Sequence, residues 1–161
     1  MAVEYSAVAV QEVAAGSPVI FTDSPVPCGK GFVFHRDGSG IFLLSSAGAS
    51  CVRPQCCCGC SNYRVPEVQY NVEFHCNLAI PTGGTAEEVQ LAIVIDGEAD
   101  PVSIMRLTPA AVEEYGSVGS SVIVSVPAIC RCQSVSIRNV STQDVEIQNA
   151  NILIDRIGVS R

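Results

Sequence analysis

The sequence predicts an all-β sandwich of about ten antiparallel strands forming a single domain, 1–161. Apolar and polar residues alternate with a period of two over most of the chain, and Gly, Pro, Ser and Asn separate the alternating stretches. No long stretch keeps a helical period. At 161 residues the chain is long enough to bury a core without disulfides.

The clearest strand is Val68 to Ile80. One face is apolar and the other polar, as expected of a strand with one face in the core. The apolar face carries Tyr70, Val72, Phe74, Cys76, Leu78 and Ile80. The polar face carries Gln69, Asn71, Glu73, His75 and Asn77.

The same pattern repeats in Val89 to Ile95. Asp96-Gly97 follows, and both residues tolerate the positive φ of a tight hairpin turn. We therefore expect Val102 to Leu107 to pair back on this strand. Turn residues delimit the remaining expected strands: Ser6 to Glu12, Pro18 to Thr22, Gly31 to Phe34, Ile41 to Ser45, Ser120 to Val126, Ser134 to Arg138 and Val145 to Ile157.

One short helix is expected, from Pro109 to Tyr115. Thr108 is suited to the N-cap, Pro109 to the first helical position, and acidic residues follow. At one or two turns it would be a connection between strands.

The composition predicts self-association. Hydrophobic residues make up 48% of the chain and charged residues only 16%. Ala92 and Val94 lie opposite an apolar face, as does Ile123, so these strands are apolar on both sides. A second subunit is the expected cover for their outer faces.

Charge and hydropathy exclude other classes of partner. Lys30 is the only lysine, and eight arginines stand against 16 acids, so no basic surface for nucleic acid is expected. No apolar run reaches the length of a membrane span. Glu4 and Glu12 occupy the region where a signal peptide carries basic residues, which predicts synthesis in the cytoplasm.

The most unusual feature is a cysteine-rich loop, 51–62, with five of the nine cysteines: Cys51, Cys56, Cys57, Cys58 and Cys60. Cys57 and Cys60 have the C-x-x-C spacing at which two thiolates reach one tetrahedral ion, and Cys130 and Cys132 form a second, weaker group. The cofactor expected at such a site is Zn or another thiolate-bound metal. Disulfide crosslinks and inert thiols remain open alternatives. Cys28 and Cys76 are expected to be structural.

No catalytic residue is predicted. His35 and His75 are the only histidines, and neither belongs to a recognisable nucleophile-base motif. Glu87-Glu88 and Glu113-Glu114 lack the alternating oxygen ligands of an EF-hand loop and are interpreted as solvated acids. Asn139-Val140-Ser141 matches a glycosylation acceptor, which carries little meaning in a protein made in the cytoplasm.

The order of several segments resembles the trimeric jelly-roll domains of the tumour-necrosis-factor and complement type, in their bacterial and phage form. The segments span nearly the whole chain: AAGSPVIFTD, GFVFHRDGSGIFLL, YNVEFHCNLAIPTGG, VQLAIVIDGE, SSVIVSVPAICRCQSVSIRNVS and VEIQNANILIDRIG. Similar domains end bacterial spore-surface glycoproteins and occur in phage head fibres and decoration proteins. The resemblance implies a ten-stranded jelly roll that trimerises around an apolar axis.

The chain departs from this pattern in two places. It has no collagen-like stalk, and the cysteine-rich loop replaces a short Gly-Tyr turn. The absent stalk favours a virion component over a spore-surface component. The segment 1–14 is expected to serve as an attachment or exchanged strand.

Three functions follow as hypotheses. The leading one is a structural, non-enzymatic virion protein, a capsid decoration or head fibre, whose partners are its own copies and a capsid or surface-layer protein. The second is a surface-binding module for a glycan or host protein, and the third a metal- or redox-responsive protein using the cysteine-rich loop. The expected location is the bacterial cytoplasm and then the virion, or alternatively the spore or cell surface.

Overall fold

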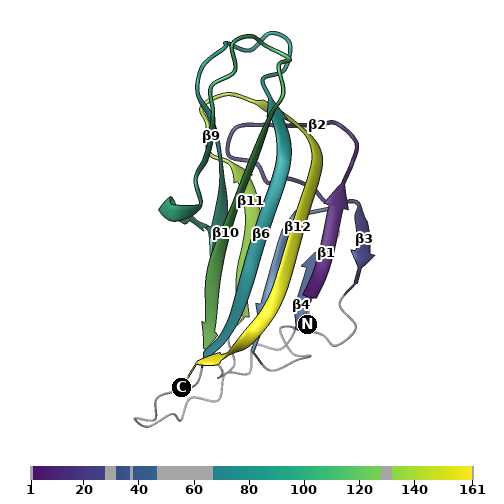
Figure 1. Ribbon diagram of the computed structural model, residues 1–161, viewed down its shortest axis with the longest axis vertical. Coiled ribbons are helices and arrows are strands. Elements are labelled where there is room, and N and C mark those ends of the chain that lie inside the picture. The colour runs from purple at the N-terminus through teal and green to yellow at the C-terminus, as the bar shows by residue number, and fades with distance from the viewer. Residues whose placement is uncertain (1, 28–31, 37, 47–66, 128–131, 161) are drawn as a thin grey trace.

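The fold was analysed in a computed structural model, which describes residues 2–27, 32–36, 38–46, 67–127 and 132–160. These residues form a sandwich of two antiparallel sheets (Figure 1). Sheet 1 has the order β10 (Gly116–Pro127), β6 (Glu67–Ala79), β12 (Val145–Ser160), β1 (Ala2–Ala7) and β3 (Asp23–Val26), with β2 (Gln11–Val13) paired to β12. Sheet 2 has the order β4 (Val33–Arg36), β5 (Ile41–Ser45), β11 (Cys132–Asn139), β7 (Val89–Ile95) and β8 (Glu98–Ala99), with β9 (Met105–Leu107) paired to β7. The predicted all-β sandwich is confirmed.

The core lies between the two sheets and is built from the alternating faces that the sequence predicts. On β6, Tyr70, Phe74 and Leu78 are fully buried, whereas Glu73 and His75 on the opposite face are exposed. The rings of Phe21, Phe42 and Phe74 meet edge to face across the core. Such contacts add to the hydrophobic gain from burying large rings, so these residues stabilise the contact between the sheets.

The hairpin after β7 forms where predicted. Asp96 and Gly97 have φ of 49° and 91°, the positive values that a tight two-residue turn requires. The return strand is interrupted, because the short 3-10 helix η1 (Pro101–Ser103) separates β8 from β9. The Ser103 hydroxyl accepts a hydrogen bond from the Ile93 amide at 2.9 Å and so replaces the missing strand partner.

Two expected strands near the N-terminus are placed differently. The expected strand Ser6 to Glu12 is divided between β1 and β2. Pro18 to Thr22 is not a strand. It follows sheet 2 through single contacts, such as the Val19 amide bound to the Ile137 carbonyl at 2.8 Å, and the regular pairing begins only at Asp23. The chain crosses from one sheet to the other here, which prevents a continuous ladder.

The expected helix from Pro109 to Tyr115 is wrong. This segment consists of bends and turns, and Glu113 has a left-handed φ of 62°. The Glu113 amide donates to the Ile80 carbonyl at 2.8 Å, so a tertiary hydrogen bond takes the group that a helix would have used. Contact with the end of β6 therefore overrides the favourable capping residues.

The expectation of apolar strands open on both faces holds for β10 but not for β7. Ala92 and Val94 are buried within the single chain, where Val94 pairs with Ala99 and the 98–104 segment folds back beside β7. A second subunit is therefore not needed to cover them. On β10, by contrast, Ile123 is 54% exposed while Val122 and Val124 are buried.

The first strand is already integrated into sheet 1. All six residues of β1 pair with β12, from Ala2 opposite Asp155 to Ala7 opposite Ala150, and β3 pairs on its other side. Val3, Tyr5 and Ala7 are buried. The role of 1–14 as an attachment or exchanged strand remains a prediction. For an exchange, β1 would first have to leave its position between β12 and β3.

Candidate functional site

The outer face of sheet 1 is a continuous, shallow surface made of side chains from four strands. Register places these residues in transverse rows, the central one being Gly119, His75, Asn151 and Ser6. On one side of it lies the row of Ser121, Glu73, Leu153 and Glu4, followed by Ile123, Asn71, Asp155 and Ala2. Most of these side chains are small or uncharged. We call this surface the sheet 1 face.

The edge of this face at β10 lacks the features that normally protect an edge strand. β10 runs for twelve residues, GSVGSSVIVSVP, without a charge and with its only proline at the end. Among the other described edges, β3 contains Asp23 and Pro25, β4 ends in Arg36, and β2, β8 and β9 have only two or three residues each. Long uncharged edges favour pairing or packing with another chain. The β10 edge is therefore the described edge best suited to an interface.

Two large apolar side chains of sheet 1 are exposed toward the end of the sandwich nearest the C-terminus, one on the β10 edge and one on β12, which β6 separates from that edge. Ile123 of β10 is 54% exposed and Ile157 of β12 is 49% exposed. Ile157 falls where the pairing of β12 with β6 shifts between Arg156 and Gly158, and such a bulge redirects a side chain. Ile123 lies on the β10 edge itself, so a partner that packs on this edge would cover it.

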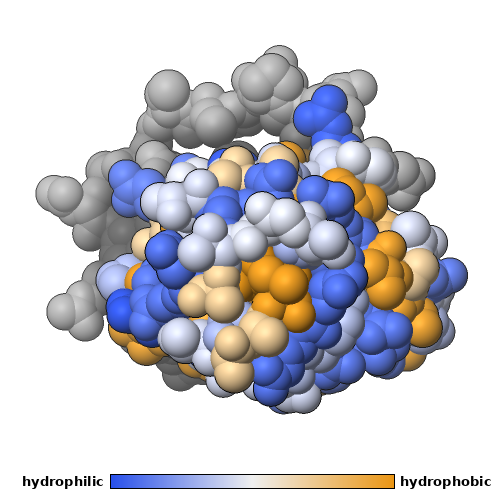
Figure 2. All heavy atoms as spheres, turned by 90° about the horizontal axis from the view of Figure 1, so that it is seen from above, coloured by the Kyte–Doolittle hydropathy of each residue, from blue (hydrophilic) through white to orange (hydrophobic). Residues whose placement is uncertain are grey.

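The opposite end of the sandwich is different in character. Figure 2, which looks onto that end, shows apolar side chains in separate small groups among hydrophilic ones. Val8 and Val10, in the connection between β1 and β2, are 63% and 51% exposed. Scattered exposed valines need no partner. We therefore place the candidate interface on the sheet 1 face and its β10 edge.

Acidic residues of the loops at this opposite end are held by local contacts. Glu88 accepts hydrogen bonds from the side chains of Gln90 and Arg106, and Glu113 accepts one from Thr82. Tyr115 donates to Glu146. Partial burial, that hydrogen bond and the nearby carboxylate charges raise the pKa of Tyr115 to about 12.

Most of the predicted metal ligands lie outside the described residues: Cys51, Cys56, Cys57, Cys58, Cys60 and Cys130. Cys132, at the start of β11, is disulfide-bonded, so it would act as a thiolate ligand only after reduction. Cys76 is a buried free cysteine on the core side of β6, and burial raises its pKa to about 12, which fits the structural role expected from its position. Within the described part of the chain, no three His, Cys, Asp or Glu side chains are grouped to hold a metal.

The two histidines occupy different environments. His75 is exposed near the centre of the sheet 1 face, over Gly119, where a β-carbon would lie 3.3 Å from the His75 β-carbon. His35 packs against the rings of Phe42 and Tyr5, with centroid distances of 4.7 and 4.9 Å, and those two rings also contact each other. The sequence signalled neither arrangement, because each depends on residues distant along the chain.

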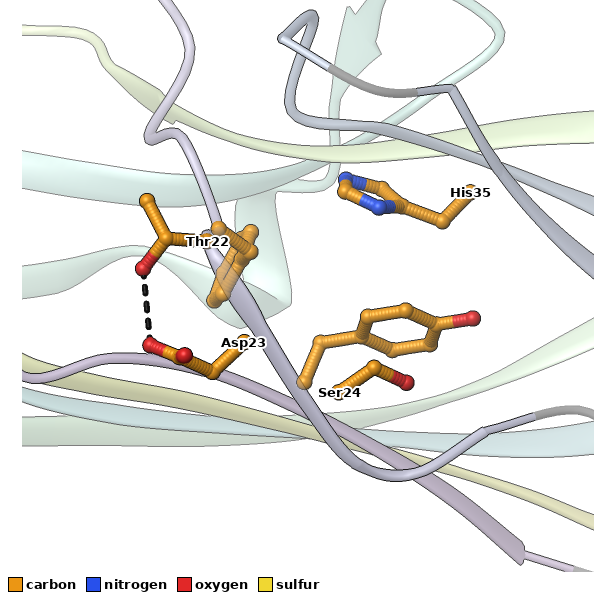
Figure 3. A pocket seen from close by; sticks show the side chains of 6 residues that line it. Thr22, Asp23, Ser24 and His35 are labelled. Carbon is orange, nitrogen blue, oxygen red and sulfur yellow. Dashed lines mark hydrogen bonds between the residues drawn. The ribbon is translucent and has the colours of Figure 1, made fainter.

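His35 also lines a pocket of about 270 Å³ at the side of the sandwich where β3 and β4 form the edges of the two sheets. The other lining residues are Tyr5, Phe21, Thr22, Asp23 and Ser24. Ser, His and Asp are the residue types of a hydrolytic triad. Figure 3 shows, however, that His35 lies across the pocket from Ser24 and that the Asp23 carboxylate turns toward the Thr22 hydroxyl. This geometry does not form a proton relay.

Asn139 lies in the interior of the protein, which its match to a glycosylation motif does not indicate. Its side chain is fully buried, and its amide nitrogen donates to the carbonyls of Val13 at 3.0 Å and Gln143 at 2.8 Å. Its side-chain oxygen accepts from the Ser141 amide at 2.9 Å. The residue therefore ties the β11–β12 connection to β2.

Comparison with protein-family models gives no match, and neither does comparison with curated proteins. Solved structures do resemble the chain over nearly its whole length. The globular domain of zebrafish complement 1qA protein shares 15% identity with a TM-score of 0.59, covering 98% of this chain and 97% of that one. The Eiger TNF from S. frugiperda shares 8% identity with a TM-score of 0.63, covering 98% and 92%.

At these identities the likeness establishes the fold. The chain has the jelly-roll fold of the complement and tumour-necrosis-factor domains, as the order of its sequence segments predicted. Within the described residues, no helix has the length and apolar composition needed to cross a membrane.

Proposed function

We propose that this protein is a structural, non-enzymatic jelly-roll homotrimer, in which the β10 edge of each subunit packs against the sheet 1 face of the next. Such a contact is heterologous, because it joins an edge of one subunit to a different surface, the face, of the next. It forms a closed ring when the rotation from each subunit to the next adds up to a full turn after a few copies. The proposed function is assembly.

The observation that carries this proposal is the unprotected edge of β10. Twelve uncharged residues border the sheet 1 face, whose side chains are mostly small or uncharged but include Glu4, Glu73 and Asp155, and Ile123 and Ile157 are exposed toward one end. Small side chains let another subunit approach closely, and burying an isoleucine contributes about 1.5–3 kcal/mol. The shared fold with the complement and tumour-necrosis-factor domains supports three as the number of subunits.

A pair of matched substitutions tests the proposed interface. Ile123→Glu places a charge in the proposed contact and should convert the trimer to monomers in sedimentation velocity. Val102→Glu is the control, because Val102 is 84% exposed on η1 and lies outside the sheet 1 face. Equal assembly of both variants, with unchanged circular dichroism, would exclude this face as the interface.

We further propose that the trimer decorates a virion as a capsid decoration or head-fibre protein, with a capsid or surface-layer protein as its partner. This finer proposal rests on the resemblance of the sequence segments to bacterial and phage jelly rolls. In this setting the protein is made in the bacterial cytoplasm and joins the particle there. Spore or cell surface attachment is the alternative location.

Particle binding tests the virion proposal independently of assembly. A tagged copy produced in cells that release phage or prophage particles should sediment with the purified particles at a fixed ratio to the major capsid protein. The Ile123→Glu variant should lose this binding if a trimer is required. A trimeric protein that stays entirely in the supernatant, or on the cell or spore surface, would overturn the virion location and leave the assembly proposal standing.

A further inference from the structure

We propose that assembly through the sheet 1 face is coupled to proton uptake by Glu73 and His75, so that the subunits associate more tightly as the pH falls below neutral. The inference rests on the proposed function, because it concerns the face that β10 of a neighbouring subunit would cover. It adds to the assembly a regulation by pH.

Carboxylates dominate the charge of the sheet 1 face. Glu73 and Glu4 lie in one transverse row, with Leu153 of β12 between them. Asp155 lies in the next row and is the diagonal neighbour of both acids. Diagonal neighbours in an antiparallel sheet are about 7–8 Å apart. The three carboxylates are therefore close enough to repel one another once water is excluded.

Little positive charge opposes these acids. The twelve residues of β10, which pairs with β6, include no ionisable side chain. His75, one row away from Glu73, is the basic side chain on this face among the described residues. Arg156 of β12 lies over the Phe32 ring instead, and Asp23 of β3 adds a further acid at the border of the face.

The acids have different partners in the free subunit. Asn151 Nδ2 donates to Glu4 Oε1 at 2.6 Å, so Glu4 would keep this partner in an assembly. Glu73 is exposed and has no hydrogen-bond or ion-pair partner among the described residues, so its carboxylate is solvated by water. An uncharged β10 edge that covers Glu73 would remove this water, and desolvation disfavours the charged form of a carboxylate.

The serine hydroxyls of a covering β10 strand can donate hydrogen bonds to Glu73, but they bring no opposing charge. Protonation of His75 supplies that charge on the same face of the same strand, and histidine side chains take up a proton between about pH 5 and 8. A protonated His75 beside a desolvated Glu73 is more favourable in the assembly than in water, where the attraction between the two charges is weaker. The assembled form therefore binds protons more readily than the free subunit, and by linkage association strengthens as the pH falls.

Sedimentation equilibrium of the full chain at about pH 8 and about pH 5.5 tests this linkage. The lower pH stays above the isoelectric point of about 4.7, which avoids non-specific association at zero net charge. The dissociation constant of the native trimer should fall at least about tenfold between the two conditions. Glu73→Gln should already assemble at least about tenfold more tightly than the native protein at the higher pH, and His75→Gln should lose most of the pH dependence.

Glu87→Gln is the matched control, because it removes the same charge from an exposed residue in the connection between β6 and β7, outside the sheet 1 face. It should assemble as the native protein does, and circular dichroism at both pH values checks the fold of each variant. A native trimer of equal strength at both pH values would overturn the inference and leave the assembly proposal standing. So would a Glu73→Gln variant that assembles no more tightly than Glu87→Gln. Monomers under both conditions would overturn both proposals.

Discussion

The phenol of Tyr70 donates a hydrogen bond of 2.5 Å to the backbone carbonyl of Ser45, which joins β6 of sheet 1 to the end of β5 in sheet 2. Tyr70 is fully buried and Ser45 is only 3% exposed, so this bond crosses the core without water. Close by, the Arg156 guanidinium lies 4.3 Å from the centroid of the Phe32 ring. These contacts hold the two sheets together at the end near Ile123 and Ile157.

Replacing Tyr70 by Phe should therefore lower the free energy of unfolding by about 1–3 kcal/mol, because the buried carbonyl loses a donor. Urea denaturation followed by circular dichroism measures the change. Tyr115→Phe is the matched control, since it removes the same atom from an exposed bond to Glu146 and should cost less than about 1 kcal/mol. Equal losses in the two variants would show that the bond to Ser45 contributes little.

Asn139→Ala should be among the more destabilising single substitutions in the chain. It removes hydrogen bonds to Val13, Ser141 and Gln143 and leaves buried backbone groups without partners, at a cost of about 2–5 kcal/mol. Thermal unfolding compares it with Thr142→Ala, an exposed residue of the same loop. A melting temperature unchanged in both variants would contradict the structural role of Asn139.

Because the Cys76 thiol is buried, the free energy of unfolding should depend on pH in the alkaline range. Burial raises its pKa from 9.0 to about 12 in the folded chain, so the unfolded chain loses this proton first. The stabilising contribution is complete below about pH 9 and declines as the pH rises toward 12. The free energy of unfolding of the native protein should therefore fall more steeply above pH 9 than that of Cys76→Val. Parallel pH profiles would show that Cys76 is not shielded in this way.

Metal analysis distinguishes a metal site from disulfides in the cysteine-rich loop. If Cys51, Cys56, Cys57, Cys58 and Cys60 hold Zn or another thiolate-bound metal, protein purified without oxygen should contain metal in a fixed ratio, and the double variant Cys57→Ser, Cys60→Ser should lose it. Metal-free protein whose denatured mass is lower by two hydrogens per bond would favour disulfides instead. Cys132 already gives one such bond.

The sequence predicted those parts of the fold that depend on local periodicity. The alternation from Val68 to Ile80 and the Asp96-Gly97 turn appear in the structure at the expected residues, because burial of one face and a positive φ are set by neighbouring residues. Thr108 and Pro109 suggested a helix, which a tertiary bond from Glu113 to Ile80 replaces. Local signals fail where a distant backbone group competes.

The candidate sites were less accessible to prediction for the same reason. Ile123 was recognised as apolar on the outer face, but the bulge that exposes Ile157 depends on the pairing of β12 with β6. The pocket combines Tyr5, Asp23 and His35 from three strands, which become neighbours only once the two sheets face each other. No spacing of residues along the sequence indicates that these three side chains come together.

The mass of the native assembly tests the central claim most directly. Native mass spectrometry of the intact protein should give three times the 16.9 kDa of one chain, with Val102→Glu at the same mass and Ile123→Glu at the mass of one chain. A native protein that remains at the mass of one chain at micromolar concentration would contradict the proposal that the β10 edge and the sheet 1 face form an assembly.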